Sequence, residues 1–247
     1  MGPGSGDPSG DPITELPRPL TAAEVEAIDA SNAFGFELLQ EVTGEDRTAT
    51  VFLSPLSASM ALGMALNGAD DTTFDAMRQT LGFEGLSEAD INESYRDLLE
   101  LLIDLDPGVE VAVGNSVWHR QGLALQQSFR DRVEEYFDAR VQALDFGDAA
   151  SADVINQWVS DVTRDRIQEM ITPPIPANMA AYLMNAVYFK AGWTEPFDPD
   201  LTRDGPFHLP DGSTETVELM IRDDTLRSHT TERYAAADLP YAGQAFS

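Results

Sequence analysis

The first side chains that could bind a metal ion or move a proton are three histidines, His119, His208 and His229. They are scattered along the chain, and each lies in a strand-like stretch. We therefore expect each histidine to be exposed or to have ordinary hydrogen-bond partners. A metal site built from His119, His208 and a carboxylate is the less favoured alternative. We expect no metal site and no cofactor.

Two acidic patterns could also carry chemistry. The stretch Asp104–Gly108 has part of a calcium-binding loop, but it lacks the third ligand before the glycine and the terminal glutamate. We therefore expect a turn that follows a helix. Glu134 and Glu135 are expected to lie on a solvated helix face rather than to form a catalytic carboxylate pair.

The motifs of common enzymes are missing from the sequence. It contains no G-x-S-x-G, no H-E-x-x-H and no S-x-x-K, the patterns that position a nucleophile or a zinc ion in hydrolases. The Gly-rich stretch at residues 4–6 follows no predicted strand and opens no predicted helix, so it is not a phosphate loop. With no cysteine there is also no thiolate chemistry and no disulfide framework. We expect that the protein is not an enzyme.

The charge balance limits the partners. The 247 residues include 43 Asp and Glu against 15 Lys and Arg, a formal net charge of −28. Such a field repels nucleic acid and anionic lipid, so we expect neither as a partner. A salt-loving host and an ordinary acidic protein both fit this composition. No apolar run is long enough for a membrane span, and no signal peptide is visible.

The strand that dominates the sequence is the run from Ala180 to Ala191. It is apolar on both alternating faces, which predicts a strand that is covered on both faces and central in its sheet. Asn185 is the one amide in this run, and it must find hydrogen-bond partners if it is buried. Trp193 follows directly after the strand.

The other predicted elements surround this strand with helices and shorter strands. Thr21 and Glu24 form a capping box that starts the first helix, and Ser54 with Pro55 starts a second helix, which is apolar nearly all round and hence buried. Residues 1–20, rich in Gly, Pro, Ser and Asp, are expected to be a disordered tail or tether to one domain over residues 21–247. Further helices are predicted near residues 74–81, 88–105, 126–137 and 151–162, and further strands over 48–53, 109–119, 141–146, 207–209 and 214–220 and from 237 onward.

Three stretches carry a resemblance to a known family. NAVYFKAGWTEPFDPDLTRDGPFHLPDGS, from Asn185 to Ser213, closely resembles the serpins, the suicide inhibitors of serine proteases. FLSPLSASMALGMALNGA, from Phe52, and SADVINQWVSDVTRDRI, from Ser151, resemble the family's buried second helix and the helix that lies across its main sheet. The resemblance implies an α+β fold, with helices packed around a large mixed sheet plus the start of a second sheet. It also implies a bacterial or archaeal type and a chain truncated before the reactive loop.

The resemblance implies a function and its sites as well. The full-length protein would trap a target serine protease as the acyl-enzyme by inserting its cleaved reactive loop as a new strand. Ser54, Ser57 and Asn185 match the family's shutter, where the sheet parts over the buried helix, and Trp193 matches its breach, where insertion begins. We expect an extracellular or bacterial-envelope protein that is monomeric when complete. The alternatives are a non-inhibitory serpin acting as a binding or chaperone-like protein, and an unrecognised hydrolase.

Overall fold

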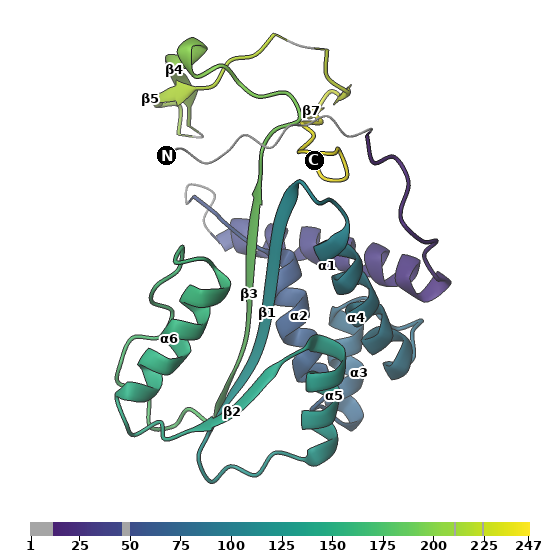
Figure 1. The fold of residues 1–247 in the computed structure, drawn as a ribbon, viewed down its shortest axis with the longest axis vertical. Coiled ribbons are helices and arrows are strands. Elements are labelled where there is room, and N and C mark those ends of the chain that lie inside the picture. Colours follow the sequence, from purple (N-terminus) through teal and green to yellow (C-terminus); the bar gives the residue numbers. More distant parts are fainter. Residues whose placement is uncertain (1–11, 46–49, 210, 224) are drawn as a thin grey trace.

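The computed structural model describes residues 12–45, 50–209, 211–223 and 225–247. Helices cover both faces of a three-stranded sheet, and two small hairpins lie beyond one end of it (Figure 1). In chain order the elements are α1 (Ala22–Glu45), α2 (Pro55–Leu66), α3 (Asp71–Thr80), α4 (Glu88–Asp104), β1 (Val109–Arg120), α5 (Gln127–Phe137), β2 (Arg140–Leu144), α6 (Ala150–Val162), β3 (Ala181–Ala191), the 3-10 turn Pro199–Leu201, β4 (Arg203–His208), β5 (Thr214–Leu219), β6 (Ser228–Thr230) and β7 (Ala235–Ala237).

The main sheet has the order β2-β1-β3, with β1 parallel to β2 and antiparallel to β3. The expectation that β3 is central is wrong for the part of the chain that the structure describes, where β1 is central and β3 is an edge strand. Apolar residues on both faces require cover above and below a strand, which α2 and α6 provide. They do not require a strand on each side. Along its outer edge, β3 (eleven residues) therefore has no partner strand within the part of the chain that the structure describes.

Two apolar cores lie on the two faces of this sheet. The larger joins α1, α2, α4 and α5 to Val117 of β1, with Met60, Met64 and Phe137 almost fully buried. The smaller joins Trp118, on the opposite face of β1, to Ile155 of α6. The neighbouring residues Val117 and Trp118 of β1 thus point into different cores, because successive side chains of a strand point to opposite faces of the sheet.

Small residues let the buried helix α2 approach its neighbours closely. A Cβ atom added to Gly63 would lie 2.7 Å from the Tyr95 ring and 3.1 Å from the Phe137 ring. Ser59 and Tyr95 are joined by their hydroxyl groups at 2.7 Å, so the polar atoms at this contact are satisfied. The N-cap is as predicted, because the Ser57 N–H donates to the Ser54 hydroxyl and Pro55 occupies the first turn.

Two predicted strands differ from the structure. Residues 50–53, the described part of the strand expected over 48–53, are not in a strand, and the Phe52 side chain is fully exposed. A short segment becomes a strand only by pairing, and no described strand lies alongside it. The strand expected from residue 237 onward is instead the end of the short β6–β7 hairpin, followed by a turn in which Tyr241 forms single bridges to Trp193 and Phe246.

The predicted tail falls partly outside the described residues, because residues 1–11 are not described. Within residues 12–20, the Ile13 N–H donates to the Gly243 carbonyl at 2.8 Å, and Arg18 binds Glu24. The assignment of residues 1–20 to a separate disordered tail stays a prediction.

An ion pair between a buried carboxylate, Glu24, and the partly exposed Arg18 stabilises the start of α1. The predicted capping box is present, with the Thr21 N–H donating to Glu24 Oε2 at 2.7 Å and the Glu24 N–H donating to the Thr21 hydroxyl at 3.2 Å. Arg18, which the capping pattern does not include, donates to both carboxylate oxygens at 2.9 and 2.5 Å. Glu24 is 1% exposed. Its hydrogen bond with Arg18, more than any other contact, lowers the pKa of its carboxyl group from 4.5 to about 2.

This pair gives the fold an acid-sensitive component. A carboxyl group whose folded-state pKa is depressed adds stability above its unfolded pKa, and that stability is lost as pH falls through the folded value. We expect the wild type to exceed Glu24→Gln in free energy of unfolding by on the order of 2 kcal/mol at pH 7, with the difference shrinking between pH 4.5 and about 2. Urea unfolding of both proteins over this range measures it. A difference that is the same at pH 7 and pH 2 would contradict the assignment.

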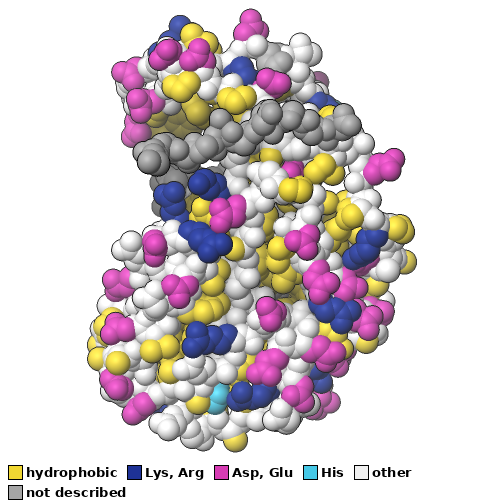
Figure 2. Space-filling model, viewed as in Figure 1, with side chains coloured by type: hydrophobic (Ala, Val, Ile, Leu, Met, Phe, Trp, Pro, Cys, Tyr) yellow, Lys and Arg dark blue, Asp and Glu magenta, His cyan; other side chains and the backbone are white. Residues whose placement is uncertain are grey.

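The acidic surface predicts a response to salt. Asp and Glu side chains are spread over the face seen in Figure 2, with fewer Arg and Lys among them. With a net charge of −28, mutual repulsion opposes the compact state until ions screen it. We expect the melting temperature to rise with KCl. Most of the rise should come below about 1 M, where the Debye length falls to about 3 Å. A midpoint that stays flat or falls would rule this out.

Candidate functional site

The centre of the site is a chain of two amides between β1 and β3. Asn185 lies directly opposite Asn115 in the antiparallel register. Its Nδ2 donates to Asn115 Oδ1 at 2.9 Å, and Asn115 Nδ2 donates in turn to the Phe137 carbonyl at the end of α5 at 2.8 Å. The pair therefore ties the edge strand, the central strand and a helix end together across the larger core.

Asn185 also reaches the buried helix. Its Nδ2 lies 3.5 Å from the Met60 sulfur on α2, a weak acceptor. Its Oδ1 is buried without a hydrogen-bond partner among the described residues. A buried amide oxygen without a donor costs about 1–3 kcal/mol, so this side chain is only partly satisfied in this part of the fold.

The two predicted serines lie one turn earlier on the same helix. The Ser54 hydroxyl caps α2 and lies 3.0 Å from the Ser57 hydroxyl. No hydrogen bond among the described residues joins either serine to Asn185. The sequence-based interpretation thus placed Asn185 over the correct helix, whereas its contact is with Met60 rather than with the first turn. The assignment of the three residues to a shutter remains a prediction.

Trp193 lies at the far end of β3, against the last residues of the chain. Its ring stacks on Tyr241 with the ring centres 4.3 Å apart and the planes at 15°, and its backbone forms a bridge with Tyr241. Phe197 contacts the Trp193 ring edge-on, with the ring centres 5.7 Å apart, so Trp193, Tyr241 and Phe197 form an aromatic cluster. These contacts hold the irregular segment after β7 against the end of the main sheet.

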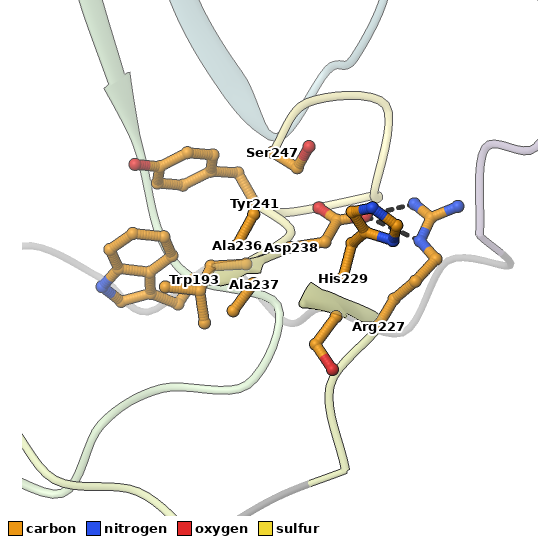
Figure 3. A pocket seen from close by; sticks show the side chains of 10 residues that line it. Trp193, Arg227, His229, Ala236, Ala237, Asp238, Tyr241 and Ser247 are labelled. Carbon is orange, nitrogen blue, oxygen red and sulfur yellow. Dashed lines mark hydrogen bonds and ion pairs between the residues drawn. The ribbon is translucent and has the colours of Figure 1, made fainter. Parts of the chain in front are cut away.

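A pocket of about 570 Å³ opens beside this cluster (Figure 3). Trp193 and Tyr241 lie along one side of it, and the ion pair between Arg227 and Asp238 lies on the other, with His229 beside the ion pair. The lining combines aromatic rings with one closed ion pair. None of its residues matches a catalytic motif.

The other candidate groups do not assemble. His119 lies on β1, His208 on β4 and His229 on β6, and the described residues contain no group of three or more His, Asp or Glu side chains that could hold a metal ion. Asp106 of the calcium-like stretch accepts from backbone N–H groups. Glu134 and Glu135 are both exposed.

Sequence reasoning missed Asn115, Met60 and Tyr241. The available signal for Asn115 was a second lone amide in a strand of alternating valines, residues 109–117. Pairing it with Asn185 requires the strand register, which local sequence does not give. Tyr241 had no signal of its own, because its contact with Trp193 joins positions 48 residues apart.

Comparison with known proteins shows the family to which this chain belongs. The family model of the serpins, serine protease inhibitors, matches residues 29–247. Serpin A12 of Rattus norvegicus is 32% identical over 190 residues, covering 76% of this chain and 46% of the relative. Corticosteroid-binding globulin of Pongo abelii is 30% identical over 196 residues, covering 78% and 48%. The crystal structure of cleaved kallistatin complexed with heparin matches with a TM-score of 0.83 and 25% identity, over 90% of this chain and 67% of that chain.

The chain therefore belongs to the serpin family, and its fold is the α+β serpin fold. It spans about half the length of the curated relatives it matches. These relatives come from mammals and give no support to the expected bacterial or archaeal type.

Among the described residues, no helix combines the length and the apolar character needed to cross a membrane.

Proposed function

We propose that the full-length protein is a suicide inhibitor of a serine endopeptidase that acts by loop insertion. The observation that supports this most is the match of residues 29–247 to the family model of the serpins, serine protease inhibitors. The structure adds the strand β3. It is a largely half-buried strand of eleven residues with α2 and α6 packed against it, and its backbone groups on one side have no partner strand among the described residues. Such an edge accepts an added strand through main-chain hydrogen bonds.

Two groups of residues lie where loop insertion would act on β3: the amide pair of Asn185 and Asn115 at its middle, and the aromatic pair of Trp193 and Tyr241 at its end. Asn185 and Asn115 hold β3 to β1 over α2, and so fix the position of the strand beside which the cleaved loop would be added. Trp193 and Tyr241 close the end of β3 where an inserting strand would enter. We assign the first group, with Ser54 and Ser57, to the shutter and Trp193 to the breach. We propose that the full-length inhibitor is extracellular and monomeric.

The second candidate is a non-inhibitory serpin that binds a ligand or another protein. It is favoured by one specific observation, the relative whose name is corticosteroid-binding globulin. The residues that separate the two functions lie in the reactive loop, where small residues in the hinge favour inhibition and bulky or charged ones oppose it.

Covalent trapping tests the proposal. We expect the full-length protein to form an SDS-stable complex with at least one of a panel of serine endopeptidases of differing primary specificity. The 247-residue chain should form none, because it covers about half of its relatives and the reactive loop of the family lies in the other part. Cleavage of the full-length protein by every protease without a trapped complex would favour the binding function. An SDS-stable complex formed by the 247-residue chain would contradict the assignment of the loop.

A further inference from the structure

Asp106 is a buried carboxylate with no role in the site as described so far. It lies in the short loop between α4 and β1 and is 4% exposed. Its Oδ1 accepts from the Gly108 N–H at 2.8 Å, and its Oδ2 accepts from the Gly243 N–H at 2.9 Å. One carboxylate thus joins two segments that are 137 residues apart in the sequence.

The segment that Asp106 holds is the one on which Trp193 packs. The Ala242 N–H donates to the Gly192 carbonyl at 2.9 Å, and the Thr194 hydroxyl donates to the Ala242 carbonyl at 3.0 Å. Tyr241, two residues before Gly243, stacks on Trp193. Fixing the backbone at Gly243 therefore fixes the ring that covers the end of β3.

The packing around this contact is tight at both glycines. A Cβ atom on Gly108 would lie 2.7 Å from the Ala242 Cβ atom, and one on Gly243 would lie 3.0 Å from Asp106 Oδ2. The two backbones approach so closely that both N–H groups point at one carboxylate. Hydrogen bonds to a charged acceptor are the stronger class, at about 1.5–3 kcal/mol each.

We infer that Asp106 is a positioning residue for Trp193: its carboxylate joins the α4–β1 loop to residues 241–246 and so sets Tyr241 against Trp193. This inference depends on the proposed function in one respect, namely that Trp193 marks the point where an inserting strand would enter. The contact itself couples the end of helix α4 to the end of β3. It acts through the backbone of Gly243, without touching Trp193.

Hydrogen exchange on the 247-residue chain tests this inference without any protease. In Asp106→Ala we expect the Gly243 and Ala242 amides to exchange at least tenfold faster, roughly the effect of losing one such hydrogen bond. In Asp106→Asn we expect this for at least one of the Gly108 and Gly243 amides. Asn keeps one oxygen acceptor but turns an NH₂ group toward the second N–H, so it should not restore both amides. The amides that pair β1 with β3, such as those of Ala112 and Tyr188, should keep wild-type protection.

The matched control is Asp104→Asn, which removes the same charge from an exposed position two residues earlier. It should leave all of these amides unchanged. Unaltered exchange at Gly243 in Asp106→Ala would overturn the inference. So would an equal loss of protection across the whole sheet, or a failure of both Asp106 variants to fold, because Asp106 would then be a general stability residue. A full-length protein that traps no protease would overturn the proposed function and leave this result standing.

Discussion

In the full-length protein, Asn185→Ala is expected to lower the melting temperature and to produce loop-linked polymers on mild heating. The substitution removes the donor to Asn115 Oδ1 and the contact with Met60. It leaves the apolar contacts of β3 in place. The loss of a partner for a buried amide costs about 1–3 kcal/mol. We expect a β3 that is held less firmly over α2 to leave its outer edge more accessible, and this edge can accept the loop of another molecule.

Native gels after a series of heating steps, together with thermal melts, measure this effect. The matched control is Asn178→Ala, the same change at an exposed position just before β3, which should behave as wild type. If Asn185→Ala melts like wild type and stays monomeric, Asn185 is an ordinary core amide and its assignment to the shutter fails.

The second large effect is a gain in stability from His119→Leu. The His119 side chain is 5% exposed on β1, and neither ring nitrogen has a hydrogen-bond partner among the described residues. Leucine has a similar volume and carries no polar atom to desolvate. We expect the free energy of unfolding at pH 8 to rise by about 1–3 kcal/mol.

Urea unfolding with a matched histidine separates this effect from a general gain in apolar content. His229 lies on β6 and is exposed, so His229→Leu should change stability by less than about 0.5 kcal/mol. A neutral or destabilising effect of His119→Leu would show that the ring nitrogens are satisfied in solution.

Sequence alone could predict the features that depend on neighbouring residues. The capping box of Thr21 and Glu24 and the N-cap at Ser54 follow from contacts three residues apart, and both are present. The helices and the long strands followed from periodicity, and the family followed from the stretch after Asn185. All of these signals are local in the chain.

The features that failed or were missed depend on distant pairing. The run of apolar residues in β3 showed that both faces are covered, but it could not show which strands lie beside it. The contacts of Asn185 with Asn115 and of Asp106 with Gly243 join positions 70 and 137 residues apart. Arg18 had no capping motif to mark it, because its pairing with Glu24 depends on how residues 12–20 turn back onto α1 and α4.

The exposed position of Lys190 on β3 has a practical consequence. Lys190 is the only lysine in the sequence, and it lies opposite Glu110 of β1, three residues before Trp193. An amine-reactive dye therefore has one side-chain target in the whole chain, at the edge strand itself. Because indole rings quench many fluorophores on contact, a label there would report the distance between the strand end and Trp193 as a change in brightness.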